Sequence, residues 1–306
     1  MNDSKIPVAV IGSGNIGVDL CERLLRDPDF ELIALVGRRS TSPGLARLQA
    51  RIPYVLSGGM DEFLLLSDHV SGVFDATSAF AHQSHWDELR ALGKWMVDLT
   101  PSRIGQPLVP VLVGKSDSMK IDGVNRVANY SMVTCGGQSC APLLYAIANH
   151  SKGIKEVEIS SSIASLSAGP ATRLNVDQYI ESTEELARIV TGCHEVKAIL
   201  VLNPADPPVM MRTTVIIEAE YFDLDSIAAE TKKIVAAVQS SVPGYEVVVA
   251  PYAMTSNRVV ATALVKGAGY YLPEYAGNLD IINAAAVETA RRHSNAIKAN
   301  AVGSTL

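Results

Sequence analysis

In the first hundred residues, apolar positions gather in short runs separated by stretches with helical spacing. The strand-like runs lie at 5–11, 30–36, 72–77 and 95–99, and the helix-like stretches lie at 18–26, 45–51 and 83–92. Strands that alternate with helices predict a parallel sheet, with ligand sites at the carboxyl ends of its strands.

Beyond residue 135 the alternation is lost. Strand-like runs occur at 154–163, 198–203, 211–219, 246–250 and 258–265, and helical stretches at 176–191, 225–240 and 281–290. Asp223 and Asp225 supply helix start signals and Pro243-Gly244 a stop. This pattern predicts an α+β layer of antiparallel sheet and helices, which commonly supplies a dimer surface and one wall of a substrate site.

A glycine-rich turn follows the first strand-like run. It reads Gly12-Ser13-Gly14-Asn15-Ile16-Gly17 and lies between an expected strand and an expected helix. In that setting the GxGxxG pattern is a strong sign of dinucleotide binding. Gly12 permits a tight turn, Gly14 lets a pyrophosphate approach the backbone, and Gly17 allows close packing of helix on strand. A merely structural glycine turn is the alternative.

The loop after the second strand bears on which dinucleotide binds. NAD-type sites usually carry an Asp or Glu there for the ribose 2′-hydroxyl, but this loop reads Gly37-Arg38-Arg39-Ser40-Thr41-Ser42. Guanidinium groups match phosphate oxygens well. We therefore expect NADP(H) as the preferred cofactor, held by Arg38, Arg39 and Ser40, with NAD(H) as the other option. Two solvated surface arginines are the alternative reading.

Hydroxyl side chains end the next strands. Thr77 and Ser78 follow one strand-like run and Thr100 follows another. We expect them to line the nicotinamide side of the site, although loop caps would use the same residue types.

One cysteine stands at the end of an apolar run, directly before two glycines and a stretch that can become a helix. The run is Val133-Thr134-Cys135-Gly136-Gly137. A helix N-terminus favours a thiolate and lowers the thiol pKa. Gly136 and Gly137 leave backbone N–H groups free to hold an oxyanion. We expect Cys135 to be a nucleophile; the alternative is a small buried hydrophobe.

Composition narrows the class of protein. The chain has 306 residues, enough for about two domains, and a net charge of −6 without a Lys/Arg cluster, which argues against nucleic acid or an anionic membrane. No run reaches the length of a membrane-spanning helix. The four cysteines form no metal-type pairs, so we expect no metal and no disulfide scaffold. With no signal-peptide pattern at the start, we expect a cytoplasmic protein.

Eight short stretches, taken together and in order, resemble the acylating acetaldehyde (propionaldehyde) dehydrogenases. They are IGSGNIGVDL, FDATSAF, DLTP, MVTCGGQ, SAGPATR, NPADPP, VPGYEV and YLPEYAGNLDI. The resemblance implies a Rossmann dinucleotide-binding domain plus an α+β dimerisation and catalytic domain, here 1–132 with 277–306 and 133–276. It implies coenzyme A as co-substrate, a homodimer, and a TIM-barrel aldolase as partner.

The resemblance also assigns residues. The acyl-carrying cysteine maps to Cys135. Cofactor contacts map to the turn from Ser13 to Ile16 and to a second segment and one asparagine, which comprise Ser167, Ala168, Gly169, Pro170, Thr172, Arg173, Asn175 and Asn278. As an ordinary connection, the second segment needs no function.

Two departures from the family pattern stand out. Arg39 replaces an Asp of the second-strand loop, which agrees with NADP(H). Thr213 stands where the family has an Asp that assists thiol and proton transfer. Thr213 cannot be a general base, so we expect it only to contact the substrate region.

The expected chemistry is the interconversion of an aldehyde and an acyl thioester through an acyl-enzyme on Cys135. Three alternatives remain open: another acyl acceptor such as phosphate or water, an acyl carrier protein in place of free coenzyme A, or a non-catalytic NADP-binding subunit.

Overall fold

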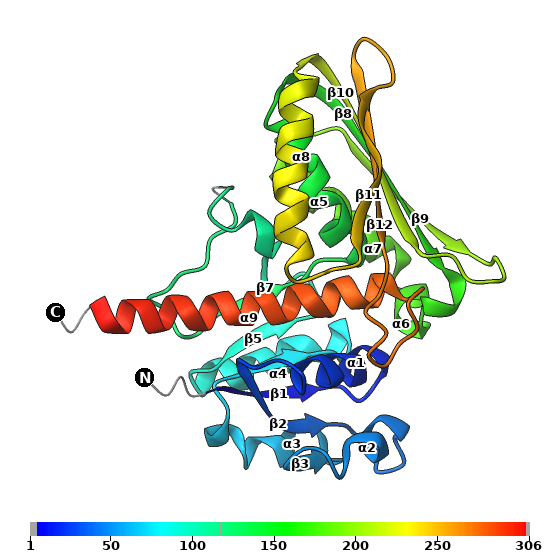
Figure 1. Cartoon of the computed structure of the whole chain (residues 1–306). Helices are drawn as coiled ribbons and strands as arrows, with labels where there is room; N and C mark the ends of the chain where they lie inside the picture. Colours follow the sequence, from blue (N-terminus) through cyan, green and yellow to red (C-terminus); the bar gives the residue numbers. More distant parts are fainter. Residues whose placement is uncertain (1–4, 117, 304–306) are drawn as a thin grey trace. The chain divides into compact units, whose positions relative to one another are not determined.

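The computed structural model describes residues 5–116 and 118–303, without the side chains of 170, 171, 302 and 303 (Figure 1). The chain forms two compact units. The first comprises residues 1–108, 121–132 and 286–306, and the second comprises 109–120 and 133–285. The expected domain limits assigned residues 109–120 and 277–285 to the first domain, whereas the contacts group them with the second unit.

The first unit is built on a seven-stranded sheet in the order β3-β2-β1-β4-β5-β7-β6. Every neighbouring pair is parallel, which confirms the expected α/β class. Its strands are β1 (Ile6–Ile11), β2 (Phe30–Val36), β3 (Tyr54–Leu56), β4 (Gly72–Asp75), β5 (Trp95–Asp98), β6 (Gln106–Pro107) and β7 (Asn129–Ser131). Its helices are α1 (Asn15–Leu24), α2 (Pro43–Leu48), α3 (Gly59–Leu64), α4 (Ala79–Ala91) and the 3₁₀ turn η1 (Ser67–His69).

The apolar runs of the first unit are its buried strands. Val8, Ala9 and Val10 of β1 are fully buried, as are Val73 of β4 and Met96 of β5. Strands buried on both faces read as continuous apolar runs, because helices cover both sides of a parallel sheet. Because β1, β4 and β5 are neighbouring parallel strands, their carboxyl ends lie at the same end of the sheet. The loops that follow these strands begin there.

The second unit holds a five-stranded sheet in the order β11-β12-β10-β8-β9. The strands are β8 (Ser151–Ala164), β9 (Val196–Asn203), β10 (Met211–Phe222), β11 (Tyr245–Ala253) and β12 (Arg258–Val265). The helical parts are α5 (Cys135–Ala148), α6 (Pro170–Leu174), α7 (Val176–Thr191), α8 (Leu224–Gln239) and the 3₁₀ turns η2 (Pro110–Leu112) and η3 (Ser165–Ser167). Asp223 caps α8 by accepting from the N–H groups of Asp225 and Ser226.

The expected antiparallel sheet is found except at one pair of strands. Strands β8 and β9 are parallel, whereas the other three pairs are antiparallel. The reason is the connection between them: the chain crosses through α6 and α7, and a helical crossover returns it in the same direction.

Helices cover one face of this sheet. Val157, Ile159 and Ile163 of β8 and Val215 and Ile217 of β10 are buried at alternate positions and belong to one apolar core with residues of α5. Figure 1 shows α5, α7 and α8 on the same side of the strands. The intervening positions of each strand face away from these helices.

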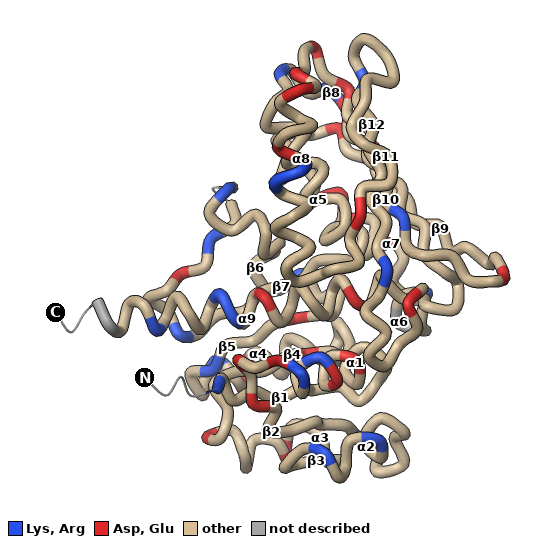
Figure 2. The backbone as a smooth tube through the Cα atoms, viewed as in Figure 1, with Lys and Arg blue, Asp and Glu red and all other residues tan. Residues whose placement is uncertain are grey.

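The last helix, α9 (Gly277–Gly303), is longer than the expected 281–290. Its second half is rich in Ala, which favours helix even where the apolar period fades. In the described ranges, no helix has both the length and the apolar character needed to cross a membrane. Lys and Arg are interspersed with Asp and Glu along both units (Figure 2).

Candidate active site and cofactor turn

The glycine turn of the first unit has the geometry of a phosphate cradle. Gly12 has φ +115°, and a Cβ there would lie 2.5 Å from the carbonyl oxygen of Ala76. A Cβ at Gly17 would lie 1.8 Å from the carbonyl oxygen of Gly12. Gly14 precedes α1, and a Cβ there would meet nothing within 4 Å. Two glycines are thus required by packing, and Gly14 faces open space at a helix N-terminus, where a pyrophosphate fits.

The loop after β2 adds unpaired positive charge. Arg38, Arg39 and Ser40 are exposed, and within the described part of the chain neither guanidinium has an ion-pair partner. The hydroxyl of Ser42 lies 2.8 Å from that of Ser13, which ties this loop to the glycine turn. The exposed Asn15 and the half-buried Ile16 complete the turn. This arrangement leaves both arginines available to a phosphate.

Thr77 and Ser78 act as caps in this structure. The N–H and hydroxyl of Thr77 both donate to Asp75 Oδ1, at 3.0 and 2.6 Å. Ser78 precedes α4 and its hydroxyl accepts from the N–H of Ala81. Their geometry is explained by the local turn, and contact with a nicotinamide stays a prediction.

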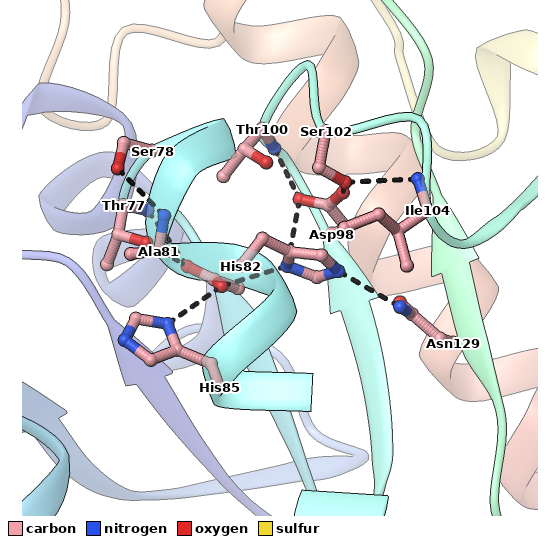
Figure 3. Close-up of polar contacts among 11 residues, drawn as sticks. Thr77, Ser78, Ala81, His82, His85, Asp98, Thr100, Ser102, Ile104 and Asn129 are labelled. Atoms are coloured by element: carbon pink, nitrogen blue, oxygen red, sulfur yellow. Dashed lines mark hydrogen bonds and ion pairs between the residues drawn. The ribbon is translucent and has the colours of Figure 1, made fainter. Parts of the chain in front are cut away.

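A buried polar cluster that the sequence analysis did not find lies beneath these loops (Figure 3). His82 of α4 is fully buried between Asp75 of β4 and Asp98 of β5. Its Nδ1 lies 2.9 Å from Asp75 Oδ2 and 3.4 Å from Asp98 Oδ1. His85 Nδ1 donates to the same Asp75 oxygen at 3.0 Å. The available signal was the aspartate that closes each of two otherwise apolar runs.

The two aspartates of this cluster have pKa values that are shifted in opposite directions. Burial opposes ionisation of Asp75, but hydrogen bonds from His82, His85 and Thr77 outweigh it and lower its pKa. Burial also opposes the charge on His82, yet its bond to Asp75 and the charge of Asp98 raise its pKa. Burial raises the pKa of Asp98 to about 6. Asp75 therefore stays ionised to lower pH than Asp98 and is the main carboxylate partner of His82.

Asn129 of β7 completes the cluster. Its amide lies 2.9 Å from His82 Nε2. An imidazolium needs an acceptor at both ring nitrogens, and the amide oxygen serves when it is turned toward the ring. That orientation also gives a partner to the buried oxygen of Asn129, which otherwise has none among the described residues.

In the second unit, Cys135 is the first residue of α5. Thr134 is the N-cap, and its hydroxyl accepts from the N–H of Gly137 at 2.8 Å. Val133 has φ +60°, a left-handed conformation that is strained for a β-branched residue. Such strain is found where the surrounding structure fixes a functional turn. The half-buried Cys135 is thus held at a defined helix start.

The expected role of the two glycines needs correction. The N–H of Gly137 is engaged by Thr134 and is not free for an oxyanion. A Cβ at Gly137 would lie 2.8 Å from Leu186 Cδ2, and one at Gly136 would lie 2.1 Å from the Tyr179 hydroxyl. Both glycines therefore make room for protein atoms. A backbone hydrogen bond from Gly136 acts to lower the pKa of Cys135, so the N–H of Gly136 remains a candidate oxyanion donor.

The expectation of a lowered thiol pKa is also wrong for the free protein. Burial raises the pKa of Cys135 to about 11, although hydrogen bonds from Tyr179 and the Gly136 N–H act in the opposite direction. The sequence motif indicates the helix N-terminus, whose electric field lowers a thiol pKa. It does not indicate the burial that raises the pKa of Cys135, because the residues that bury this thiol are distant in sequence.

Thr213 lies close to this site. It is on β10, fully buried, and its Oγ1 is 3.2 Å from Ser161 Oγ of β8. A hydrogen bond from Ser161 acts to lower the pKa of Tyr179, and the Cys135 thiol donates to the Tyr179 hydroxyl at 3.8 Å. The structure therefore brings Cys135, Gly136 and Thr213 together and adds two residues that sequence reasoning missed.

The segment from Ser167 to Asn175 is folded on itself. Arg173 donates to the backbone oxygens of Ala168 and Ser165 and to the Ser165 hydroxyl. Ser167 donates to the backbone oxygen of Ala164. Gly169 precedes α6, which begins at Pro170 and includes the half-buried Thr172. Arg173 shapes the segment, and contacts from it to a cofactor stay predictions.

Asn278 differs from that segment. Its side chain is 2% exposed, and its Oδ1 has no hydrogen-bond partner within the described residues. A buried amide oxygen without a partner is costly. Asn278 therefore fits the expected role of a ligand contact.

A glycine-turn parallel unit and an α+β unit with a cysteine at a helix N-terminus are typical of two-domain dehydrogenases with a cysteine nucleophile. The profile described as "Prokaryotic acetaldehyde dehydrogenase, dimerisation" matches residues 135–273. Acetaldehyde dehydrogenase from Pectobacterium atrosepticum is 42% identical over 93% of this chain and 94% of its own. Those from Geobacillus thermodenitrificans and Spirochaeta aurantia are each 40% identical over about 95% of both chains. The chain belongs to the prokaryotic acetaldehyde dehydrogenase family, which confirms the resemblance seen in its motifs.

Proposed function

We propose that this chain interconverts an aldehyde and an acyl-CoA through an acyl-enzyme on Cys135. The observation that carries the proposal is the position of Cys135 as the first residue of α5, directly after the Thr134 side chain that caps this helix. Full-length similarity to acetaldehyde dehydrogenases supports a short aldehyde as substrate.

The residues divide the work as follows. The Cys135 sulfur adds to the aldehyde carbon, and the Gly136 N–H donates to the developing oxyanion. When bound, a nicotinamide cofactor would supply the hydride acceptor for the carbon that is attached to the Cys135 sulfur. The resulting thioester on Cys135 is then open to attack by the thiol of coenzyme A, which restores the cysteine.

We further propose that the cofactor is NADP(H) in preference to NAD(H). The glycine turn suits the pyrophosphate of either one, because backbone N–H groups at the N-terminus of α1 would bind it and both cofactors carry it. Arg38 and Arg39 favour the form with a 2′-phosphate, since both are exposed and, within the described ranges, unpaired.

A homodimer is part of the proposal, since the second unit matches a dimerisation profile over residues 135–273. A TIM-barrel aldolase as supplier of the aldehyde is supported by the family resemblance alone.

The test replaces the nucleophile. In Cys135→Ala, CoA-dependent aldehyde oxidation is expected to fall by at least about 10⁴-fold, because the covalent route is lost. The matched control is Cys140→Ala, which removes a buried thiol of the same helix. Incubation with aldehyde and oxidised cofactor, without coenzyme A, should add one acyl mass to the wild type and the control and none to Cys135→Ala.

Acceptor specificity is read in the same assay. Coenzyme A, phosphate and water are compared as acyl acceptors. Full activity in Cys135→Ala would refute the nucleophile assignment, and equal turnover with phosphate would refute the CoA-dependent reaction.

A further inference from the structure

Three buried hydroxyl groups lead away from the Cys135 sulfur. The thiol donates to the Tyr179 oxygen at 3.8 Å. A hydrogen bond from Ser161 acts to lower the pKa of Tyr179, and Ser161 Oγ lies 3.2 Å from Thr213 Oγ1. Tyr179, Ser161 and Thr213 are 7%, 1% and 0% exposed. The three residues come from α7, β8 and β10, and we call them the hydroxyl chain.

Helix contacts fix the phenol beside the thiol. The Thr183 hydroxyl, one turn along α7, donates to the backbone oxygen of Tyr179 at 2.7 Å. It also lies 2.7 Å from the hydroxyl of Thr134, the N-cap of α5. The hydrogen bond between Thr134 and Thr183 therefore joins the start of α5 to the turn of α7 that carries Tyr179. It fixes the position of the Tyr179 hydroxyl relative to the Cys135 thiol.

Gly136 gives independent support for this placement. A Cβ at Gly136 would lie 2.1 Å from the Tyr179 hydroxyl and 2.8 Å from Ser161 Oγ. Any side chain at residue 136 would displace the phenol. The absence of a side chain beside Cys135 thus serves the approach of this hydroxyl.

The chemistry of the thiol creates a need for the phenol. With its pKa raised to about 11 by burial, the Cys135 thiol keeps its proton near neutral pH. Addition to a carbonyl then requires that proton to move as the C–S bond forms. Among the described residues, no hydrogen bond joins an Asp, Glu or His to Cys135 or to the hydroxyl chain, and Thr213 cannot accept a proton outright.

We propose that the Tyr179 hydroxyl relays the proton from the Cys135 thiol to the oxygen of the aldehyde. As the sulfur bonds to the carbonyl carbon, the S–H bond breaks and its proton passes to the phenol oxygen. The phenol's own proton passes to the carbonyl oxygen. The products are a neutral thiohemiacetal and an unchanged tyrosine, so no net acid or base is consumed.

In this scheme Ser161 and Thr213 are positioning residues. Tyrosine oxygen has two lone pairs and one proton. When Ser161 donates to one lone pair of the phenol oxygen and the Cys135 thiol donates to the other, the phenol proton is left to point toward the substrate, and Thr213 holds Ser161 in place by donating to it. This role explains a buried threonine at residue 213 that touches no reacting atom.

The decisive variant is Tyr179→Phe, which keeps the ring and removes the hydroxyl. We expect kcat/KM for the aldehyde to fall by about 10²-fold, the lower range for loss of a positioned proton-transfer group. The KM for the nicotinamide cofactor should not change. Tyr245→Phe is the matched control, because Tyr245 is a fully buried tyrosine whose hydroxyl donates to the backbone oxygen of Ser139 in α5.

A second readout does not depend on turnover. The rate of Cys135 alkylation by iodoacetamide is followed from pH 6 to pH 11 by mass spectrometry of the Cys135 peptide. Loss of the Tyr179 hydrogen bond should move the profile to higher pH and slow alkylation at pH 8 by about tenfold, the effect of one pKa unit. Tyr245→Phe should follow the wild-type profile.

The positioning residues are tested by graded variants. Ser161→Ala and Thr213→Val should each lower kcat by about tenfold while leaving KM for the aldehyde near the wild-type value, and Thr213→Ser should restore most of the loss. Equal activity of Thr213→Val and Thr213→Ser would contradict the positioning role.

The relay rests on the proposed function, and the two can fail separately. If the wild type lacks CoA-dependent dehydrogenase activity, the proposed function is wrong whatever the alkylation profiles show. If the wild type is active and Tyr179→Phe matches it in both kcat/KM and alkylation profile, the relay is wrong and the acyl-enzyme on Cys135 still stands.

Discussion

At the scale of single residues, Arg38 and Arg39 give the sharpest test of cofactor choice. Replacement of each by Ala should lower kcat/KM for NADPH by about 10- to 100-fold, because a hydrogen bond to a charged group contributes about 1.5–3 kcal/mol. The value for NADH should change by less than about twofold. Arg90→Ala removes an exposed arginine of α4 in the same unit and is the control.

The comparison uses initial rates with both cofactors at one fixed ionic strength, since phosphate contacts weaken with salt. An equal loss with NADPH and NADH, or no loss with either, would mean that the two guanidinium groups do not read the 2′-phosphate.

Residue-level prediction from the sequence succeeded where the rule is local. Gly12, Gly14 and Gly17 lie in the expected strand–turn–helix, and contacts with the backbone of the neighbouring turns require glycine at residues 12 and 17. The prediction of the thiol pKa failed because burial of Cys135 depends on distant segments. Tyr179 is 44 residues from Cys135 along the chain, and no periodicity indicates that their side chains meet.

At the scale of secondary-structure elements, the His82 cluster joins α4 to β4, β5 and β7. The effect of pH on the stability that this cluster contributes follows from Asp98. Burial raises the pKa of Asp98 to about 6 in the folded protein, against about 3.9 in an unfolded chain. The folded state therefore holds a proton that the unfolded state has lost between about pH 4 and pH 6. This contribution to the free energy of unfolding is complete below about pH 4 and is lost as the pH rises to 6.

Asp98→Asn carries no such contribution. Relative to the wild type, its free energy of unfolding should increase by about 2–3 kcal/mol as the pH is raised from 4 to 6. His82 stays protonated throughout this window, because its pKa is raised above its ordinary value. The measurement is urea unfolding at several pH values, with the exposed Asp68→Asn as control. Parallel curves for Asp98→Asn and the wild type would contradict the assignment.

The positions of the helices and strands along the chain were predicted better than the direction in which neighbouring strands pair. The expected helix at 176–191 is α7 with the same bounds, and each of the five strands expected in the second unit is present within a few residues. Alternation of apolar residues defines which face of a strand is buried but not its direction. The parallel pairing of β8 and β9 depends on the crossover through α7, so it could not be read from either strand.

At the scale of the whole molecule, the sheet of the second unit has an open face. Its other face packs on α5, α7 and α8. On β9, Ile199 and Val201 are 51% and 44% exposed. They pair in register with Ser160 and Ser162 of β8. Exposed apolar side chains gathered on one sheet face mark a protein interface, and the family profile covering this unit is a dimerisation profile. We therefore predict that the open face is the dimer surface.

The double variant Ile199→Glu/Val201→Glu should be monomeric by light scattering at concentrations where the wild type is dimeric. Glutamates buried in a two-fold interface would lose hydration without an opposite charge to pair with, and each enters the interface twice, which together costs several kcal/mol. The circular dichroism spectrum should not change, since both side chains lie outside the core. Leu65→Glu, at an exposed apolar residue of the first unit, is the control and should remain dimeric. A double variant that stays dimeric would place the interface elsewhere. A double variant that is monomeric yet keeps the wild-type alkylation profile of Cys135 would show that each chain builds the environment of its own nucleophile.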